Sequence, residues 1–458
     1  MVFRSHVLFF LLFFTTILQA QEQLSYQIEA ATYLSSEDNL PFWMQANRQG
    51  MVRKEDQAQL YLSLLYDFKK KPTNQLNFSA AADLLAFTES KQNKVEINAL
   101  YAAVSYQKTL LTVGSKQITE HYGGLSSSNG NIIFSGNARP IPGVWLETDG
   151  YWKVPFAGEK LSFKAAFGNG YLFDDRFVED AQIHHKSLEF KWQLSEKSSL
   201  LFGVEDYAIW GGTSKELGPL PKDFSDFLRV VGGLSGSGDS PEGDAINALG
   251  NHIGAYRLEY QKHTKNFNLN LYWSHPFEDT SGRELNNIED GLYGVFIDFK
   301  KPESALAKLA FEFTYTKDQS GKGQIDGFDD FFNNTIYRSG YTFFGRTLGS
   351  PFFIPKEIDE NGLTLGVQNN SFIAYHLGFS GKFRKNLYYK NRMSLSFNEG
   401  TKSLRFDESR TQFSMLLEID YKPNAWPVFV SAGFGWDEGS LFDDAVGVYF
   451  KIVKTGFF

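Results

Sequence analysis

The sequence contains no cysteine, which excludes disulfide bonds, thiolate catalysis, cysteine-ligated metals and a lipidated cysteine anchor. Beyond one apolar stretch near the start, it also lacks any run that approaches the roughly 20 apolar residues of a membrane-spanning helix. An excess of positive charge is missing as well, because the formal net charge is -8 with both signs interspersed. Without a basic stripe to neutralise phosphates, nucleic acid is not expected to be a partner.

Aromatic residues are abundant: 16% of the chain is aromatic, with 44 Phe and 22 Tyr. That content exceeds what a soluble core requires, whereas a membrane barrel uses it for a lipid-facing band and two aromatic girdles. Apolar and polar residues also alternate along most of the chain with the period of a β-strand, as in Phe413 to Tyr421. A soluble sandwich alternates too, so this pattern alone does not separate the two folds.

Connection lengths favour the barrel. Eighteen strands are predicted near 24–34, 58–68, 75–85, 95–106, 109–118, 143–153, 160–170, 187–194, 199–210, 252–262, 267–276, 292–300, 307–317, 372–382, 387–398, 411–421, 427–437 and 445–458. From the second strand on, short polar turns alternate with longer connections, and the long outer loops are expected at 35–57, 119–142, 211–251 and 318–371. This rhythm predicts an all-β fold, a large antiparallel transmembrane β-barrel with long extracellular loops and little helix.

The amino-terminal segment has the pattern of a secretory signal. Basic residues precede an apolar run from Val7 to Leu18, and the small Ala20 marks the expected cleavage point. Residues 1–20 are therefore predicted to be a signal peptide, and residues 21–458 a single barrel domain.

The carboxy-terminal segment suits the closing strand of an outer-membrane barrel. Its apolar face runs to an aromatic end and consists of Val446, Val448, Phe450, Ile452, Gly456 and Phe458. An aromatic terminus of this kind is what the barrel assembly machinery of Gram-negative bacteria commonly reads. We therefore expect export to the outer membrane of a Gram-negative bacterium, with the assembly machinery, outer-membrane lipid and lipopolysaccharide as partners.

One loop is predicted to contain a short helix. Phe224, Phe227, Leu228 and Val231 fall on one helical face before a glycine stop. Such a helix could fold into the lumen or cap its mouth.

Motifs for catalysis, cofactors or metals are not prominent. His-Glu-x-x-His and Gly-x-Ser-x-Gly do not occur, and His184-His185 is interpreted as a solvated pair in a loop. Phe-Asp-Asp at 173–175, 328–330 and 442–444 could bind Ca²⁺, although surface solvation is the simpler interpretation. We therefore expect a protein that is not an enzyme and has no cofactor, while a hydrolase at the barrel rim stays an alternative.

Several polar segments combine aromatic rings with Asn, Arg and Gly. Flat rings beside planar amide and guanidinium donors suit sugars, whose apolar faces are rimmed by hydroxyl groups. The candidate carbohydrate-binding residues are Trp43, Asn47, Arg48, Asn137, Arg139, Trp145, Asn251, His252 and Arg346. The alternative is that Arg139 and Arg346 pair with lumen carboxylates such as Glu147 and only brace the loops.

Three of these segments carry a resemblance to a known family. They are the Pro41-Phe-Trp entry with Asn47-Arg48, the Gly-Asn-Ile-Ile-Phe-Ser-Gly-Asn-Ala-Arg-Pro-Ile-Pro block at 130–142, and the segment 337–351 with Gly-Arg-Thr-Leu-Gly-Ser-Pro. In these segments the chain resembles the capsule assembly Wzi family. The resemblance implies an eighteen-stranded outer-membrane barrel that anchors capsular polysaccharide without turnover. It also implies a helical bundle closing the periplasmic end, for which no stretch of this sequence is obviously long enough.

The sequence thus predicts a non-catalytic barrel that binds and anchors capsular or extracellular polysaccharide at the cell surface. A diffusion porin is the main alternative. The charges predicted to line the lumen do not decide between them, because both proteins need a polar interior; these residues are Glu189, Lys191, Arg257, Glu259, Lys308, Glu312, Lys390 and Arg392.

Overall fold

The computed structural model describes residues 24–68, 76–89, 92–237, 241, 248–278, 280–319 and 329–458. The predicted signal peptide, its cleavage point at Ala20 and the predicted turn at 69–74 lie outside these residues. None of the helices in the described ranges is long and apolar enough to cross a membrane.

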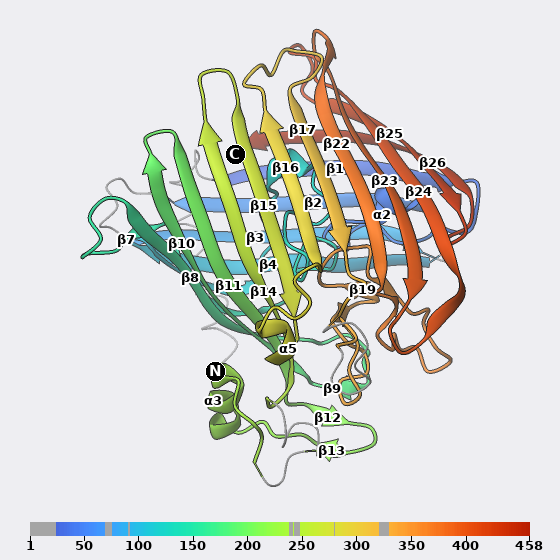
Figure 1. Cartoon of the computed structure of the whole chain (residues 1–458). Coiled ribbons are helices and arrows are strands. Elements are labelled where there is room, and N and C mark those ends of the chain that lie inside the picture. Colours follow the sequence, from blue (N-terminus) through green and yellow to red (C-terminus); the bar gives the residue numbers. More distant parts are fainter. Residues whose placement is uncertain are drawn as a thin grey trace, which may run out of the picture.

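Eighteen antiparallel strands close into one barrel (Figure 1). Each strand pairs with its neighbours along the chain, and β26 closes the ring on β1, with Ser25 opposite Phe457 and Ser35 opposite Gly447. The short β6 and β7 both pair with β8 and together form one barrel strand. The strands are β1 (Leu24–Ser35), β2 (Gln57–Phe68), β3 (Leu76–Glu89), β4 (Gln92–Tyr106), β5 (Thr109–Ser115), β6 (Gly143–Thr148), β7 (Trp152–Lys153), β8 (Leu161–Tyr171), β10 (Gln182–Ser195), β11 (Ser198–Trp210), β14 (Asn251–His263), β15 (Asn268–Phe277), β16 (Gly291–Asp298), β17 (Lys308–Tyr315), β22 (Phe372–Arg384), β23 (Leu387–Gly400), β24 (Arg405–Tyr421), β25 (Phe429–Gly439) and β26 (Ala445–Phe457).

All eighteen predicted strands are present, and the predicted fold class is confirmed. The largest differences occur at outer ends, where polar residues interrupt the alternation: β24 begins at Arg405, and β10 begins at Gln182. The earlier start of β10 makes the prediction for the histidine pair wrong. His184 and His185 lie in a strand rather than in a solvated loop, and His184 is fully buried.

The alternation in sequence becomes an apolar outer wall. In β26, Val448, Phe450 and Ile452 point outward and are about half exposed, whereas Tyr449 and Val453, on the opposite face of the strand, are buried inside. A closed barrel pairs the backbone groups of every strand, and an apolar outer surface is stable only against hydrocarbon. The barrel therefore spans a membrane.

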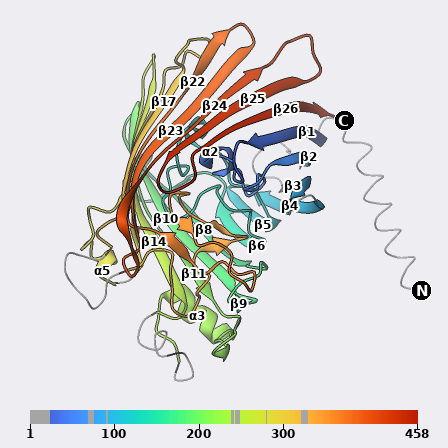
Figure 2. The same ribbon diagram turned by 90° about the vertical axis from the view of Figure 1, so that its right-hand side faces the viewer.

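Long and short connections emerge at opposite ends of the barrel. Short turns such as 196–197 and 385–386 lie at the end where β1 starts and β26 finishes, and the long loops lie at the other end (Figures 1 and 2). In outer-membrane barrels the short turns are periplasmic, so the long-loop end is extracellular.

The loops hold small elements of their own. These are α2 (Phe42–Gln45), the 3₁₀ turn η1 (Tyr122–Gly124), β9 (Val178–Glu179), β12 (Thr213–Ser214), β13 (Gly218–Pro219), α3 (Phe224–Gly232), α5 (Thr280–Arg283), β18 (Thr342–Phe343), β19 (Arg346–Thr347), β20 (Ile354–Pro355) and β21 (Val367–Asn369). The longest helix in the described part of the chain is α3, with 9 residues. The described helices do not form the periplasmic bundle that the family resemblance implies.

The predicted loop helix is confirmed as α3, but its expected position is wrong. The Asp226 carboxylate accepts a hydrogen bond from the Asp223 amide at the start, and Gly233 ends the helix with a φ of 60°. Instead of entering the lumen or capping its mouth, α3 packs on the outside of the wall through Phe227 and Val230. Residues of β11 that alternate outward, Ala208 and Trp210, supply the apolar surface that holds it there.

Candidate functional site

Three extracellular loops turn back into the barrel and fill it. We call the described parts of 36–56, 116–142 and 316–371 the loop plug. Trp43, Ile132, Phe332 and Phe353 from these loops are all essentially inaccessible to solvent and belong to one buried apolar cluster. The Phe332 and Phe353 rings stack with their centroids 4.1 Å apart. The interior of this barrel is therefore a packed core over the depth that the plug occupies.

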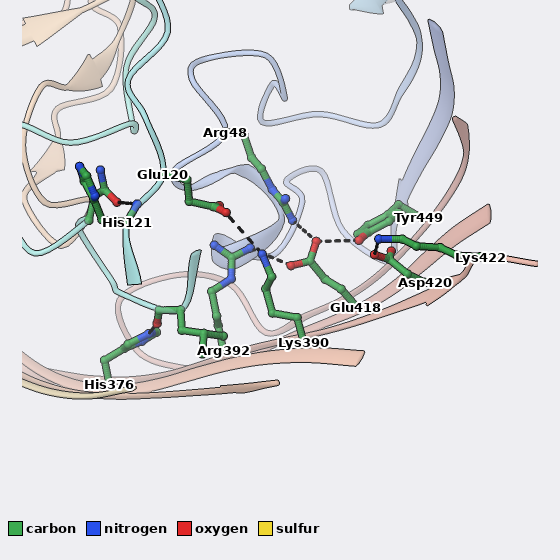
Figure 3. A network of polar contacts seen from close by, with 12 residues as sticks. Arg48, Glu120, His121, His376, Lys390, Arg392, Glu418, Asp420, Lys422 and Tyr449 are labelled. Atoms are coloured by element: carbon green, nitrogen blue, oxygen red, sulfur yellow. Dashed lines mark hydrogen bonds and ion pairs between the residues drawn. The ribbon is translucent and has the colours of Figure 1, made fainter. Parts of the chain in front are cut away.

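A buried carboxylate on the wall holds the first loop. One oxygen of Glu418 in β24 accepts hydrogen bonds from the Arg48 guanidinium at 2.7 Å and from the Tyr449 hydroxyl at 2.7 Å. Its other oxygen accepts a bond from Arg392 of β23 at 3.2 Å (Figure 3). Arg48 therefore binds the first loop to the wall through Glu418, which Tyr449 and Arg392 also bind.

Two further wall carboxylates hold the second loop in the same way. Glu312 of β17, fully buried, accepts bonds from the Ser126 hydroxyl at 2.5 Å and the Ser127 amide at 2.7 Å. Glu205 of β11 accepts a bond from the Asn131 side chain at 2.8 Å. The sequence predicts a lumen position for Glu312, but the anchoring role of these carboxylates cannot be predicted from it, because their partners are distant in the chain.

The three family-like segments meet at one junction inside the plug. The Asn137 side chain accepts a hydrogen bond from the Asn47 amide at 3.2 Å and donates to the Thr347 carbonyl at 3.1 Å. Next to it, the Ser135 hydroxyl donates to the Gly349 carbonyl at 2.6 Å. Asn47 and Asn137 therefore lie together, and Asn137 is buried between loops.

Arg139 braces the plug against the wall. Its guanidinium lies 3.0 Å from the Glu96 carboxylate and donates to the Ile97 carbonyl at 2.8 Å. Ile97 precedes Asn98, the extra residue of a β-bulge in β4, so the arginine bonds the wall where the ladder is interrupted. Arg139 thus pairs with a wall carboxylate, as the bracing alternative expects, but the partner is Glu96 and not Glu147. Burial lowers the pKa of Arg139, and the nearby Glu96 charge opposes that shift.

Arg346 also braces loops, through neutral acceptors. It donates to the Val52 carbonyl at 2.7 Å and lies 3.4 Å from the Gln45 side-chain oxygen. Burial, assisted by the nearby Arg53 charge, lowers the pKa of Arg346 to about 10, which leaves the group charged at neutral pH. Arg346 therefore links the third loop to the first through this hydrogen bond to Val52.

Both candidate tryptophans pack inside the barrel. Trp43 of α2 is fully buried, donates to the Ser394 hydroxyl at 2.9 Å and lies with the Arg392 guanidinium 5.3 Å from its ring. Trp145 of β6 covers Gly168 and Gly170 of β8, where an added Cβ would meet its ring at 2.3 and 3.0 Å. The bare glycines make room for this ring.

Asn251 and His252 lie on opposite faces of the barrel, because successive residues of a strand alternate. Asn251 is buried on the inside, and its carbonyl accepts a bond from the Tyr341 hydroxyl. His252 points outward, and its Nδ1 lies 3.0 Å from the Asp206 carboxylate. These two neighbours cannot contact one ligand together.

An aromatic pair that sequence analysis did not single out is exposed at the outer surface. Phe173, after β8, is 49% exposed, and Phe344 in the third loop is 36% exposed, with their centroids 5.2 Å apart. The Arg139 guanidinium covers the Phe344 ring at 4.3 Å, and the Asp174 carboxylate accepts a bond from the Phe344 amide at 3.0 Å. Phe344 belongs to one of the family-like segments, and a polymer outside the cell can reach this supported pair.

A cavity of about 50 Å³ among Asn47, Gln49, Glu120 and Arg392 has room for a few water molecules rather than a sugar ring. Within the described ranges, His and acidic residues do not gather in threes with metal-binding geometry. One carboxylate of each Phe-Asp-Asp motif already has protein partners: Asp174 bonds Arg176, Asp330 bonds Asn370, and Asp444 bonds the Gly439 amide.

The fold and the plug define the class of protein: a bacterial outer-membrane β-barrel whose lumen is filled by its own extracellular loops. The model of the family described as capsule assembly protein Wzi matches residues 14–370. The chain belongs to this family.

Solved structures show the same fold. Wzi of Escherichia coli, described as an outer membrane protein involved in group 1 capsule assembly and a carbohydrate-binding β-barrel, is similar with a TM-score of 0.59 at 13% identity, covering 96% of this chain and 86% of that one. OccK5 (OpdH) and OccK3 (OpdO) of Pseudomonas aeruginosa have TM-scores of 0.51 at 10% and 12% identity, each covering 96% of this chain and 98% of theirs. None of the curated proteins matches the chain.

Proposed function

We propose that this protein binds capsular polysaccharide at the extracellular face of the outer membrane and holds it there without turnover. The loop plug is the observation that carries the proposal. An interior core that includes fully buried Trp43, Phe332 and Phe353 suits a rigid binding platform and opposes diffusion through the lumen. Family membership supports the same function, because the related barrel of E. coli is described as carbohydrate-binding.

The contact surface in this proposal is the exposed pair Phe173 and Phe344. An exposed aromatic face can stack on the apolar face of a sugar ring, and Arg139 behind Phe344 fixes its orientation. Neither ring is among the nine residues predicted from the sequence, several of which lie behind the surface as supports. Asn47, Asn137, Arg139 and Arg346 support the platform by joining its loops.

Repetition makes weak contacts sufficient. A polymer presents the same sugar many times, so a site of modest affinity retains it by rebinding, and many copies of the protein can hold one chain. Neither rebinding by one copy nor joint retention by many copies requires a catalytic group. Export with cleavage near Ala20, insertion by the barrel assembly machinery and contact with lipopolysaccharide belong to the same proposal.

Deletion of the protein tests the function in the cell. We expect capsular polysaccharide to move from the cell surface into the medium while its total synthesis is unchanged. Unchanged cell-bound polysaccharide would contradict the anchoring function and favour the porin. A glycan array on detergent-purified protein would identify the polymer, and release of shortened glycan in that assay would instead indicate a hydrolase.

Phe344→Ala tests the contact surface. Loss of one stacked ring should weaken glycan binding by about 1–2 kcal/mol, or roughly 5- to 30-fold. Ile358→Ala is the matched control, because Ile358 is also an exposed apolar residue of the third loop but lies outside the aromatic pair. Equal binding by Phe344→Ala and the control would remove Phe344 from the contact surface.

A further inference from the structure

Helix α3 lies against the outer wall at the extracellular end of the barrel, where the membrane would meet the protein. Phe227 is the contact residue, with its ring 5.4 Å from that of Trp210 in β11 and 5.4 Å from that of His184 in β10. Both partners alternate outward, on the same face as the lipid-facing Leu188 and Val204. The helix therefore occupies a place where lipid would otherwise contact the strands.

Under this segment the wall carries polar groups that face outward. The Lys186 ammonium lies 2.6 Å from the Asp206 carboxylate, which also bonds His252. The remaining nitrogen of His252 contacts the Leu249 carbonyl at 3.1 Å, and His184 is fully buried. Charged groups on the lipid face of a barrel are costly at hydrocarbon depth. We call Lys186, Asp206 and His252 the outer polar patch; α3 and Leu249 lie beside and over it.

The side of α3 away from the wall is divided into an apolar and a polar flank. Phe224 is 75% exposed and Leu228 53% exposed, and these residues lie one turn apart on the same flank. Ser225, exposed, lies about 100° further round the helix, on the flank shared with Arg229. Leu234, just beyond the helix, is 56% exposed. The apolar flank continues into the lipid-facing wall, because the Phe224 ring lies 6.4 Å from that of Phe227, which in turn lies 6.3 Å from that of the outward-facing Phe167 in β8.

We propose that α3 is an interfacial strap that lies in the outer leaflet of the membrane. Lipid acyl chains cover Phe224, Leu228 and Leu234, while the polar flank faces the headgroups and water. Continuity with the lipid-facing wall identifies lipid as the occupant, because the same hydrocarbon already contacts the strands beside the helix. In this position the strap also separates the outer polar patch from hydrocarbon.

Site-directed spin labelling tests the strap, and the absence of native cysteine makes every introduced thiol unique. Phe224→Cys and Leu228→Cys are labelled with a nitroxide in nanodiscs of outer-membrane lipid, and collision with oxygen and with a water-soluble nickel complex is measured. We expect high oxygen and low nickel accessibility at both sites. Ser225→Cys in the same helix should show at least about tenfold higher nickel accessibility relative to oxygen.

Two reference sites define the scale. Phe450→Cys, on the lipid-facing side of β26, should behave as lipid-exposed, and Ile358→Cys, on an outer loop, as water-exposed. Nickel accessibility at Phe224 and Leu228 equal to that of Ile358 would overturn the proposal. Dipolar broadening between labels at Phe224 on different molecules would overturn it too, because the occupant would then be a second copy of the chain. The proposal does not depend on glycan binding, so the deletion experiment cannot decide it.

Discussion

At the scale of single residues, buried carboxylates on the wall decide where the loops go. Glu418 pairs with two arginines, one from the first loop and one from β23, at a position almost closed to solvent. Attraction between such charges offsets the cost of taking them out of water only when all partners are present. Removing one partner leaves the others buried without compensation.

Glu418→Gln should therefore release the first loop. The amide keeps the shape but loses the charge that Arg48 and Arg392 share, at a cost of about 3–5 kcal/mol. We expect faster hydrogen exchange in residues 36–56, while the barrel keeps its heat-modifiable mobility on gels. Asp420→Asn on the same strand is the control: Asp420 pairs with Lys422 at 3.1 Å, both are about a third to a half exposed, and its loss should change stability by less than about 1 kcal/mol. Similar exchange in the two variants would contradict the role of Glu418.

For the aromatic candidates, burial decides whether a ring packs inside the barrel or is available to a ligand. Trp43 and Trp145 looked suited to sugars by type, yet burial assigns them to packing. Phe344 became the exposed ring because its backbone has a φ of 51°, a left-handed conformation that turns the chain there. That conformation results from the surrounding loop contacts, including the bond from its amide to Asp174.

At the scale of elements, α2 docks on a stretch of wall without side chains. Gly435 of β25 and Gly447 of β26 are paired across the strands and face inward. An added Cβ at Gly447 would meet Met44 Sδ and Pro41 Cδ at 2.6 Å each. The two glycines let the short helix lie directly on the sheet.

Gly447→Leu should prevent this docking. A leucine there overlaps the helix, and overpacking costs about 1–3 kcal/mol or more where the backbone cannot move away. We expect protease sensitivity within 36–56 and slower refolding into detergent micelles. Val446→Leu, one residue earlier and facing lipid, adds volume outside the barrel and should behave as the parent. Resistance of the Gly447 variant to cleavage would show that α2 docks elsewhere.

A second element-scale prediction concerns pH. Asp290, fully buried just before β16, accepts bonds from the Asp318 and Gln319 amides at 3.0 and 2.7 Å, and burial raises its pKa to about 7. The unfolded pKa is near 3.9, so the folded loop holds the proton more tightly. Stability from this group is complete below about pH 4 and is lost as the pH rises through about 7.

Acidification from pH 8 to pH 5 should therefore protect the contact between 290 and 318–319 against hydrogen exchange, after correction for intrinsic rates, by on the order of 2–3 kcal/mol. Asp290→Asn cannot titrate and should lose that pH dependence, although its NH₂ group faces a donor and weakens the contact at every pH. A parent protein whose corrected protection falls on acidification would contradict the assignment.

At the scale of the whole molecule, closure and filling are separate properties. Eighteen strands enclose a space wide enough for an aqueous channel, and the loop plug occupies it. Each loop is held both to the wall and to another loop, so the plug is one body rather than three flaps.

Planar bilayer recordings test this filling. The parent protein should conduct poorly, whereas a variant with residues 36–56 replaced by a short Gly-Ser linker should conduct at least about tenfold more. The replacement is compatible with the barrel because Tyr33 pairs with Gln57, so the two strand ends are adjacent. Replacing 401–404 in the same way is the control for loop shortening. Large conductance steps from the parent would favour a porin and contradict the packed interior.

The number of strands, their order and the direction in which each side chain points could be predicted, because they depend on residues close together in the chain. Period-two alternation assigns each residue of β26 to lipid or lumen, and turn lengths assign the ends of the strands to the two sides of the membrane. The outer end of β10 was missed because its outward residues, His184 and Lys186, are polar. The segment with α3 packs beside these residues, and nothing in the sequence of β10 itself indicates that contact.

The destinations of the loops depend on contacts between residues far apart in the chain. Arg48 meets Glu418 across 370 positions, and Asn137 meets Thr347 across 210. Several carboxylates could receive each loop arginine by charge alone, and Arg139 in fact pairs with Glu96 rather than the expected Glu147. Alternation along a strand is a property of neighbours, so the chain's order of residues suffices to specify the barrel. The tertiary structure alone decides which residues support the platform, which form the exposed contact and which form the outer strap. These roles follow from burial and pairing in the closed barrel, and burial and pairing depend on all loops together.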